Sequence, residues 1–273
     1  MALPLSPQVF AILSALVEEH AGLQYSPADR ELFAEKVSAR AVDQGFESLL
    51  DYYYFMRYDA AGALELTRLV EAMVVHETYF FREVQQLEWL VDHFLAPRCA
   101  AGVRPRVWSA ACATGEEPLT LAMLLADRNL TGQVELVATD ISERALDRAR
   151  AGRFPLRSLR STARAELASR YLRQRDGEMV IVPELHAAVR FERVNLIDRA
   201  QVERLGRFDA VVCRNALIYF RDEMTQRVVD DLVGRLAPDG VLLVGVSESL
   251  LRFGTSVDCE EHGGVFIYRP VRS

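Results

Sequence analysis

The sequence predicts an α/β protein in which a parallel sheet is covered by helices on both faces and is preceded by a small helical bundle. In the first hundred residues, apolar side chains recur at three- and four-residue steps, as on one face of a helix. From Arg106 onward, short apolar runs alternate with amphipathic segments, which is the rhythm of βαβ units. Hydrophobic residues make up 50% of the 273-residue chain, so it can bury a large core beside a smaller domain.

The helical spacing is clearest in VFAILSALVEEHAG, ELFAEKVSARAVDQG and LELTRLVEAMVV. Gly22, the Ser26-Pro27 pair and Gly45 separate these segments, and Ser26 is a candidate N-cap for a helix that begins near Pro27. We therefore expect a helical domain over residues 1–75.

The alternating part contains the apolar runs RVWSAA, VELVATD, VRFERVNL, FDAVVCRN and VLLVGVS, with a last strand in GGVFIYRP. Helices are expected to begin near Glu116, Glu143 and Glu223. We expect residues 76–273 to form one α/β domain, whose ligands bind beyond the carboxyl ends of the strands, where the strand order reverses.

Residues 152–190 interrupt this rhythm with an arginine-rich segment that ends in a possible short strand, EMVIV. An insertion of this length between sheet units is often a functional subdomain, and the alternative is a long structural loop with its own helix. The arginines between Arg148 and Arg175 form either a basic patch or an ordinary solvated surface.

Composition narrows the function classes. The net charge of −7 and the pI near 5.4 argue against nucleic-acid binding. The chain has no apolar run of roughly 18 residues and no signal peptide, so we expect a cytoplasmic protein without membrane insertion. Its four cysteines lack CxxC spacing, which favours reduced thiols over a metal site, and no heptad pattern demands partners, so a monomer is expected.

Polar or small residues follow four of the expected strands. WSAACATGEEP would let the backbone approach a ligand before a helix begins at Glu116. Asp140 ends VATD at the offset from this loop where an acid binds ribose hydroxyls, although it could instead cap the next helix. Asn195 follows the next run, and Arg214 and Asn215 follow FDAVVC, where a structural salt bridge is the alternative. Together these strand ends favour a nucleotide-like cofactor site.

The helical part ends in VVHETYFFREV, which contains Thr78 and Arg82 four residues apart. If this segment is helical, both side chains lie on one face, beside three consecutive aromatic residues. The segment either packs its aromatic side chains into a core or reaches the cofactor.

Six segments resemble one known family. HETYFFRE, VWSAACATGEEPLTLAMLLAD, ATDISERALDRARAGRF, RVNLID, FDAVVCRNALIYF and LAPDGVLLVGVSESL together resemble the chemotaxis receptor methyltransferases of the CheR family, over essentially the whole chain. Single motifs occur in many methyltransferases, but TxFFRE, TGEEP and CRNxLIYF in this order are specific. The resemblance implies a Rossmann-like class I fold with a mostly parallel seven-stranded sheet, S-adenosylmethionine as cofactor and S-adenosylhomocysteine as product.

The resemblance also implies functional residues at the positions that match the family motifs. The cofactor residues would be His76, Thr78, Arg82, Glu117, Asp140, Asn195, Leu196, Arg214 and Asn215, with Arg82 and Tyr219 nearest the transferred methyl group. Two positions depart from the family pattern, because His76 replaces a usual asparagine and Leu119 a common tyrosine. A protonated His76 would lose its hydrogen-bond acceptor, so cofactor affinity could fall at acid pH.

The implied substrate is the cytoplasmic part of a chemoreceptor (methyl-accepting chemotaxis protein), esterified on glutamate side chains. The helical domain would meet the receptor through Arg30, Lys36 and Arg40, although Glu31 and Glu35 dilute their charge. The alternatives are a methyltransferase of the same fold that acts on another molecule, and a catalytically silent protein that only binds the cofactor. Which receptor and which glutamates are involved, and whether residues 152–190 bind a receptor tail, stay open.

Overall fold

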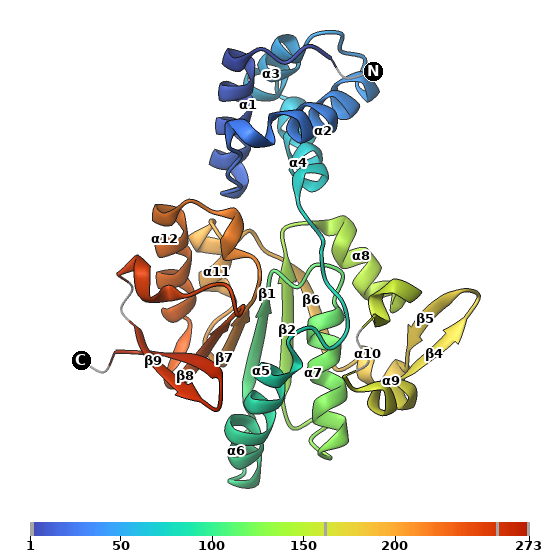
Figure 1. Cartoon of the computed structure of the whole chain (residues 1–273), viewed down its shortest axis with the longest axis vertical. Helices are drawn as coiled ribbons and strands as arrows, with labels where there is room; N and C mark the ends of the chain where they lie inside the picture. The colour runs from blue at the N-terminus through green and yellow to red at the C-terminus, as the bar shows by residue number, and fades with distance from the viewer. Residues whose placement is uncertain (1–2, 161–162, 255–256, 272–273) are drawn as a thin grey trace. The chain divides into compact units, whose positions relative to one another are not determined.

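The computed structural model describes residues 3–160, 163–254 and 257–271. The chain divides into two compact units (Figure 1): residues 1–75 with 219–221, and residues 76–218 with 222–273. No helix among the described residues is long and apolar enough to cross a bilayer.

The first unit is helical. Its helices are α1 (Pro7–Ala21), α2 (Arg30–Asp43), α3 (Leu49–Tyr58) and α4 (Gly62–Met73). The hydroxyl of Ser6 caps α1 by accepting from Val9 N at 3.2 Å, and Gly22 ends the helix with φ 74°, a conformation that glycine adopts without strain. Phe33, fully buried on α2, packs edge-on against Phe10.

The second unit is built on a seven-stranded sheet with the order β6-β2-β1-β7-β8-β10-β9. Its strands are β1 (Arg106–Ala110), β2 (Glu135–Asp140), β6 (Val189–Arg193), β7 (Phe208–Cys213), β8 (Leu236–Val244), β9 (Val257–His262) and β10 (Val265–Pro270). The first five are parallel, whereas β10 pairs antiparallel with β8 and β9. The order reverses between β1 and β7, so ligand-binding residues are expected at the carboxyl ends of these strands.

Helices accompany this sheet, and those expected near Glu116, Glu143 and Glu223 are present, whereas α11 (Arg199–Arg204) was not predicted. They are α5 (Val84–Trp89), a π-helical turn (Leu90–Leu95), α6 (Ala96–Ala100), α7 (Glu116–Asp127), α8 (Glu143–Ala151), α11 (Arg199–Arg204) and α12 (Asp222–Val233). Figure 1 shows α5 and α7 along one face, where Leu87 and Leu121 share one buried core with Val107 and Ala210 of the central strands. The predicted fold class is confirmed, although the sequence analysis did not identify β9.

The interruption after α8 contains a second, three-stranded antiparallel sheet with the order β3-β5-β4. Its strands are β3 (Arg153–Pro155), β4 (Leu172–Arg175) and β5 (Glu178–Ile181), with two short helices, α9 (Ala165–Tyr171) and α10 (Pro183–His186). The expected strand in EMVIV is β5, and its two neighbours were not predicted. The segment is therefore a small subdomain rather than a long structural loop.

Candidate functional site

The loop between β1 and α7 passes close to α8. Ala111, Ala113 and Gly115 all have positive φ, at 57°, 48° and 93°. A Cβ atom on Gly115 would lie 2.8 Å from the Cβ of Ala149, so only glycine fits at this close approach. The small residues of this motif thus serve a tight turn beside α8, and helix α7 begins at Glu116 as the sequence predicted. Their approach to a ligand stays a prediction.

Asp140 anchors this loop from the end of β2. Its side chain is buried, with Oδ2 accepting from Ala113 N at 2.8 Å and Oδ1 accepting from Ser142 N at 2.9 Å. It does not cap α8, because the hydroxyl of Ser142 does so by accepting from Ala145 N. Burial raises the pKa of Asp140, and the surrounding N–H groups and His76 oppose that rise. The N–H of Ile141 also interacts with this carboxylate, and since a carboxylate has about four lone-pair directions, one remains for a ligand.

Arg214 is the buried centre of the site at the end of β7. Its side chain is 1% exposed, and its guanidinium donates to Glu117 Oε2 at 3.1 Å and to the carbonyl oxygen of Arg82 at 2.7 Å. A third acceptor is Glu83, whose Oε2 lies 3.2 Å away. The Nε atom is buried without a hydrogen-bond partner among the described residues, which leaves one donor of this cation unsatisfied. The structural salt bridge proposed as an alternative therefore exists, but it does not satisfy the whole guanidinium.

The two acids around Arg214 have opposite pKa shifts. Burial raises the pKa of Glu117, and the attraction of Arg214 and a hydrogen bond from Ser109 only partly offset it. For Glu83, burial also raises the pKa, but Arg214, the N–H of Val246 and the amide of Asn215 together lower that pKa below its ordinary value. The groups around Arg214 thus favour the ionised form of Glu83 more than that of Glu117.

Asn215 is positioned by a buried carboxylate that the sequence analysis missed. Glu248, 5% exposed, accepts from the N–H groups of Asn215 at 2.5 Å, Leu217 at 2.8 Å, Gly245 at 2.8 Å and Ile218 at 3.3 Å. This one side chain joins the segments that follow β7 and β8. It also holds Asn215 at a positive φ of 59°.

The HETYFFRE segment is not helical, so Thr78 and Arg82 do not share a helix face. Helix α5 begins only at Val84, and Phe81 and Glu83 have positive φ values of 62° and 45°. The turn is held because Phe80 N donates to Ser158 O at 2.8 Å and Phe81 N to Thr120 Oγ1 at 3.1 Å. Both phenyl rings are buried, so tertiary contacts override the local helical spacing.

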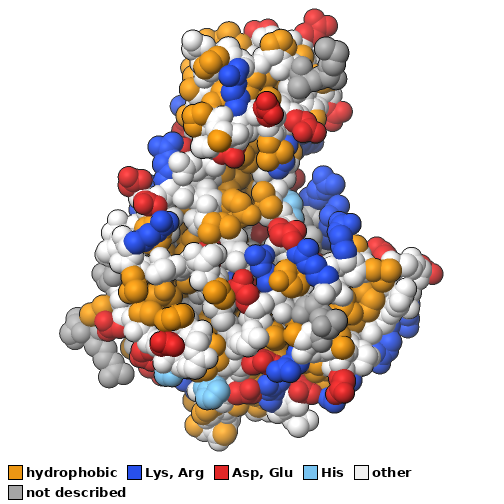
Figure 2. Space-filling view, viewed as in Figure 1, with side chains coloured by type: hydrophobic (Ala, Val, Ile, Leu, Met, Phe, Trp, Pro, Cys, Tyr) orange, Lys and Arg blue, Asp and Glu red, His pale blue; other side chains and the backbone are white. Residues whose placement is uncertain are grey.

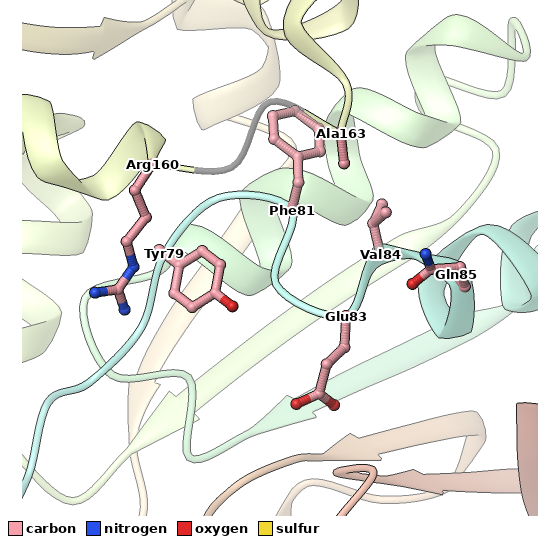
Figure 3. Close-up of a pocket in the computed structure, with 7 residues that line it drawn as sticks. All are labelled: Tyr79, Phe81, Glu83, Val84, Gln85, Arg160 and Ala163. Carbon is pink, nitrogen blue, oxygen red and sulfur yellow. The ribbon is translucent and has the colours of Figure 1, made fainter.

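The side chains of this turn diverge. Figure 3 shows Phe81 directed toward Ala163 and Glu83 directed away from it, toward the strands of the sheet. Tyr79 and Arg160 lie beside each other, with the guanidinium carbon 4.1 Å from the ring centroid. Arg82 donates to the carbonyl oxygen of Glu77 at 2.8 Å, so a main-chain contact within the same segment positions its side chain.

The remaining expected cofactor residues lie at two further places. Asn195 and Leu196 follow β6, next to β2, where Val194 N donates to Asp140 O at 3.0 Å. Leu196 is buried, and the side-chain oxygen of Asn195 accepts from Ile197 N at 3.3 Å. His76 and Thr78 line a small cavity beside the loop after β1.

The expected substrate residues of the helical unit have internal partners. Arg40 forms an ion pair with the buried Glu65 at 2.6 Å, and Tyr52 donates to the same carboxylate at 2.6 Å. Lys36 donates to Met73 O at 3.1 Å, and burial lowers its pKa. Arg30 donates to the carbonyl oxygen of Leu5. These contacts leave Arg40 the least available of the three for a partner protein.

Tyr219 belongs to the helical unit, where its carbonyl oxygen accepts from Gln24 N at 2.8 Å. The structure therefore leaves its predicted role beside Arg82 as a prediction. Among the described residues, no group of three or more His, Cys, Asp or Glu side chains is placed to hold a metal, and the four cysteines are unbridged.

The fold and the site define the class of protein. A sheet of this order, with an acid at the end of β2 and a small-residue loop after β1, is that of a class I S-adenosylmethionine-dependent methyltransferase. The model of the CheR methyltransferase SAM-binding domain matches residues 76–262. The chain belongs to the CheR methyltransferase family.

Three similar proteins of known family are named chemotaxis protein methyltransferases. Chemotaxis protein methyltransferase 2 of Vibrio cholerae is 33% identical over 239 residues, which cover 86% of this chain and 83% of the relative. Chemotaxis protein methyltransferase 1 of Pseudomonas aeruginosa is 32% identical over 250 residues, 88% of this chain and 90% of the relative. The Salmonella typhimurium chemotaxis protein methyltransferase is 31% identical over 252 residues, with coverage of 90% and 85%.

Proposed function

We propose that this methyltransferase esterifies glutamate side chains on the cytoplasmic part of a chemoreceptor, in the cytoplasm. The observation that carries the proposal is Arg214, a buried cation at the end of β7 that joins the FFRE turn to Glu117 in the first turn of α7, beside the point where the strand order reverses. The relatives named above, which span most of this chain, are chemotaxis protein methyltransferases.

The residues fit S-adenosylmethionine, which has a ribose diol, an ammonium group and a carboxylate. Asp140 offers its remaining lone-pair direction for the diol, and Glu117 offers an acceptor for the ammonium. The unsatisfied Nε of Arg214 and the amide of Asn215 are donors for anionic or polar groups. We assign cofactor binding to these four residues together with His76, Thr78, Arg82, Asn195 and Leu196.

The cofactor supplies an electrophilic methyl group on a sulfonium, and the protein positions that group and the acceptor carboxylate. A glutamate has an ordinary pKa of about 4.3, so the acceptor is already ionised at neutral pH and needs no general base. Holding two reactants in line can lower the barrier by about 7–11 kcal/mol. Arg82 acts as a clamp rather than a tight partner of the acceptor, because a strong ion pair would stabilise the ground state and reduce its nucleophilicity.

Tyr219 is assigned the alignment of the reacting groups. Its hydroxyl can donate or accept one hydrogen bond without adding a charge that would compete for the carboxylate. Arg30, Lys36 and Arg40 are assigned to receptor recognition, with their internal contacts reducing the charge that each one presents.

A methyl-transfer assay on a receptor cytoplasmic fragment tests the proposal. The protein is incubated with methyl-labelled S-adenosylmethionine, and the labelled fragment is then treated with mild base. Glutamyl methyl esters release labelled methanol, whereas methylated lysine or arginine side chains keep the label. Label on the fragment that resists base, or no label on it while S-adenosylmethionine binds, would contradict the receptor assignment.

A further inference from the structure

A cavity of about 130 Å³ lies where segment 76–78, the loop after β1, helix α8 and the start of the insert come together. Its wall includes the hydroxyl-bearing Thr78 and Thr114 and four arginines, Arg148, Arg153, Arg157 and Arg160. Figure 2 shows Lys and Arg side chains gathered on this side of the methyltransferase unit. The proposed function does not use these arginines.

The acids near the cavity are already partnered. Glu116 is buried, and its two oxygens accept from the hydroxyls of Thr114 at 2.6 Å and Ser158 at 2.8 Å. Glu77 forms an ion pair with Arg160.

The four arginines differ in their partners. Arg153 pairs with Glu178 at 2.7 Å, and Arg160 with Glu77. In the described part of the chain, Arg148 and Arg157 have no ion pair with an acid. The cavity therefore has two arginines without an ion pair, although Glu77, whose pKa is lowered chiefly by its hydrogen bond from Arg160, also interacts with the charge of Arg157.

The size of the cavity restricts its ligand. Sites for nucleotides and other cofactor-sized molecules occupy about 300–1,000 Å³, more than twice the space available here. A single carboxylate fits this volume, and a guanidinium fork binds a carboxylate through two parallel hydrogen bonds. The wall residues His76 and Thr78 are themselves proposed cofactor residues, so a group bound here would lie beside the proposed cofactor site.

We propose that this cavity binds a carboxylate of the protein substrate, from an acidic residue near the glutamate that is methylated. The inference rests on the proposed function, in which the acceptor is a glutamate of a protein. Arg148 and Arg157 supply the charge that recognises this second acid, and their guanidinium groups supply the hydrogen-bond donors. Complementary charge of this kind selects the partner and its register more than it changes the chemical step.

The test compares two double variants that remove the same charge. R148Q/R157Q removes the unpaired arginines, and R144Q/R150Q removes two exposed arginines of α8 that do not line the cavity. R148K/R157K keeps the positive charge but not the planar guanidinium that can bind a carboxylate through two hydrogen bonds. Calorimetry measures the binding of a glutamate-rich receptor peptide to the S-adenosylhomocysteine-loaded protein, and the methyl-transfer assay gives KM and kcat for the receptor fragment.

The R148Q/R157Q variant loses two exposed charge pairs, each of which contributes a factor of about three to affinity. Its peptide Kd and fragment KM should therefore rise about tenfold. We expect unchanged kcat, unchanged S-adenosylhomocysteine affinity, a near-wild-type control and partial recovery in the lysine variant. Equal effects in the control would show general electrostatics and overturn the inference, as would a loss of S-adenosylhomocysteine binding in R148Q/R157Q, which would assign the cavity to the cofactor.

Failure of the proposed function is distinguishable from failure of this inference. If wild-type protein methylates the fragment and R148Q/R157Q has the same KM and peptide Kd, the second-acid site is wrong and the proposed function stands. If wild-type protein transfers no methyl group but binds the peptide through Arg148 and Arg157, the recognition site stands and the assigned reaction is wrong. If it neither methylates the fragment nor binds the peptide, both are wrong.

Discussion

Replacing Glu248 by glutamine should destabilise the methyltransferase unit and weaken cofactor binding together. The carboxylate accepts from four main-chain N–H groups, of Asn215, Leu217, Ile218 and Gly245. An amide keeps one oxygen and places an NH₂ group against the donors that the other oxygen served. Hydrogen bonds to charged groups contribute about 1.5–3 kcal/mol each, so losing two should lower the free energy of unfolding by about 3–6 kcal/mol.

This loss is a large fraction of an ordinary stability of about 5–15 kcal/mol, so urea unfolding followed by circular dichroism will detect it. The same samples, tested below the unfolding transition, should bind S-adenosylhomocysteine more weakly because Asn215 loses its anchor. E223Q is the matched control, because Glu223 is an exposed acid at the start of α12. A shift in E248Q no larger than that of E223Q would refute the argument that this carboxylate joins the two strand ends.

Four further predictions follow from the site and the helical unit. Asp140→Ala should abolish measurable S-adenosylmethionine binding by calorimetry, and retained affinity would remove Asp140 from the site. Tyr219→Phe should lower kcat while leaving cofactor affinity unchanged, and an unchanged rate would remove its alignment role. Because the folded pKa of Glu83 lies below its ordinary value, its contribution to stability is present above the unfolded pKa and is lost as pH falls through the folded one. Urea unfolding of wild type should therefore lose more stability on acidification than that of E83Q, and parallel profiles would contradict this. Arg40→Ala removes the close cation from the buried Glu65, which keeps only the Tyr52 hydroxyl and Arg68 at 4.0 Å. It should destabilise the protein by about 3–5 kcal/mol, measured by urea unfolding, whereas a change below about 1 kcal/mol would show that these groups and water replace the pair.

The sequence was sufficient for the elements whose signals are local. The apolar runs placed the five parallel strands, and the residues that end them, such as Asp140 and Arg214, meet at one edge because parallel strands share a direction. The resemblance of the motifs predicted the family, which the comparisons show. The assignments of individual residues to the cofactor stay predictions.

What the sequence did not predict depends on contacts between distant residues. Arg40 pairs with Glu65, 25 positions away, and no periodicity reports such a pair, while its role toward a partner protein stays a prediction. The positive φ values of Phe81 and Glu83 are imposed by tertiary contacts on residue types that rarely adopt them. Glu248 carried one signal that was overlooked, because it is an acid four residues after a buried strand.

The assignment of Tyr219–Arg221 to the helical unit affects how parts of relatives can be exchanged. Besides the carbonyl contact of Tyr219 with Gln24, Arg221 forms an ion pair with Glu18 of α1. A chimaera that replaces only residues 1–75 would therefore combine a foreign helical bundle with a native three-residue segment that belongs to the original one. Exchanging the helical unit between relatives requires both pieces to move together, and a single junction near residue 75 would separate them.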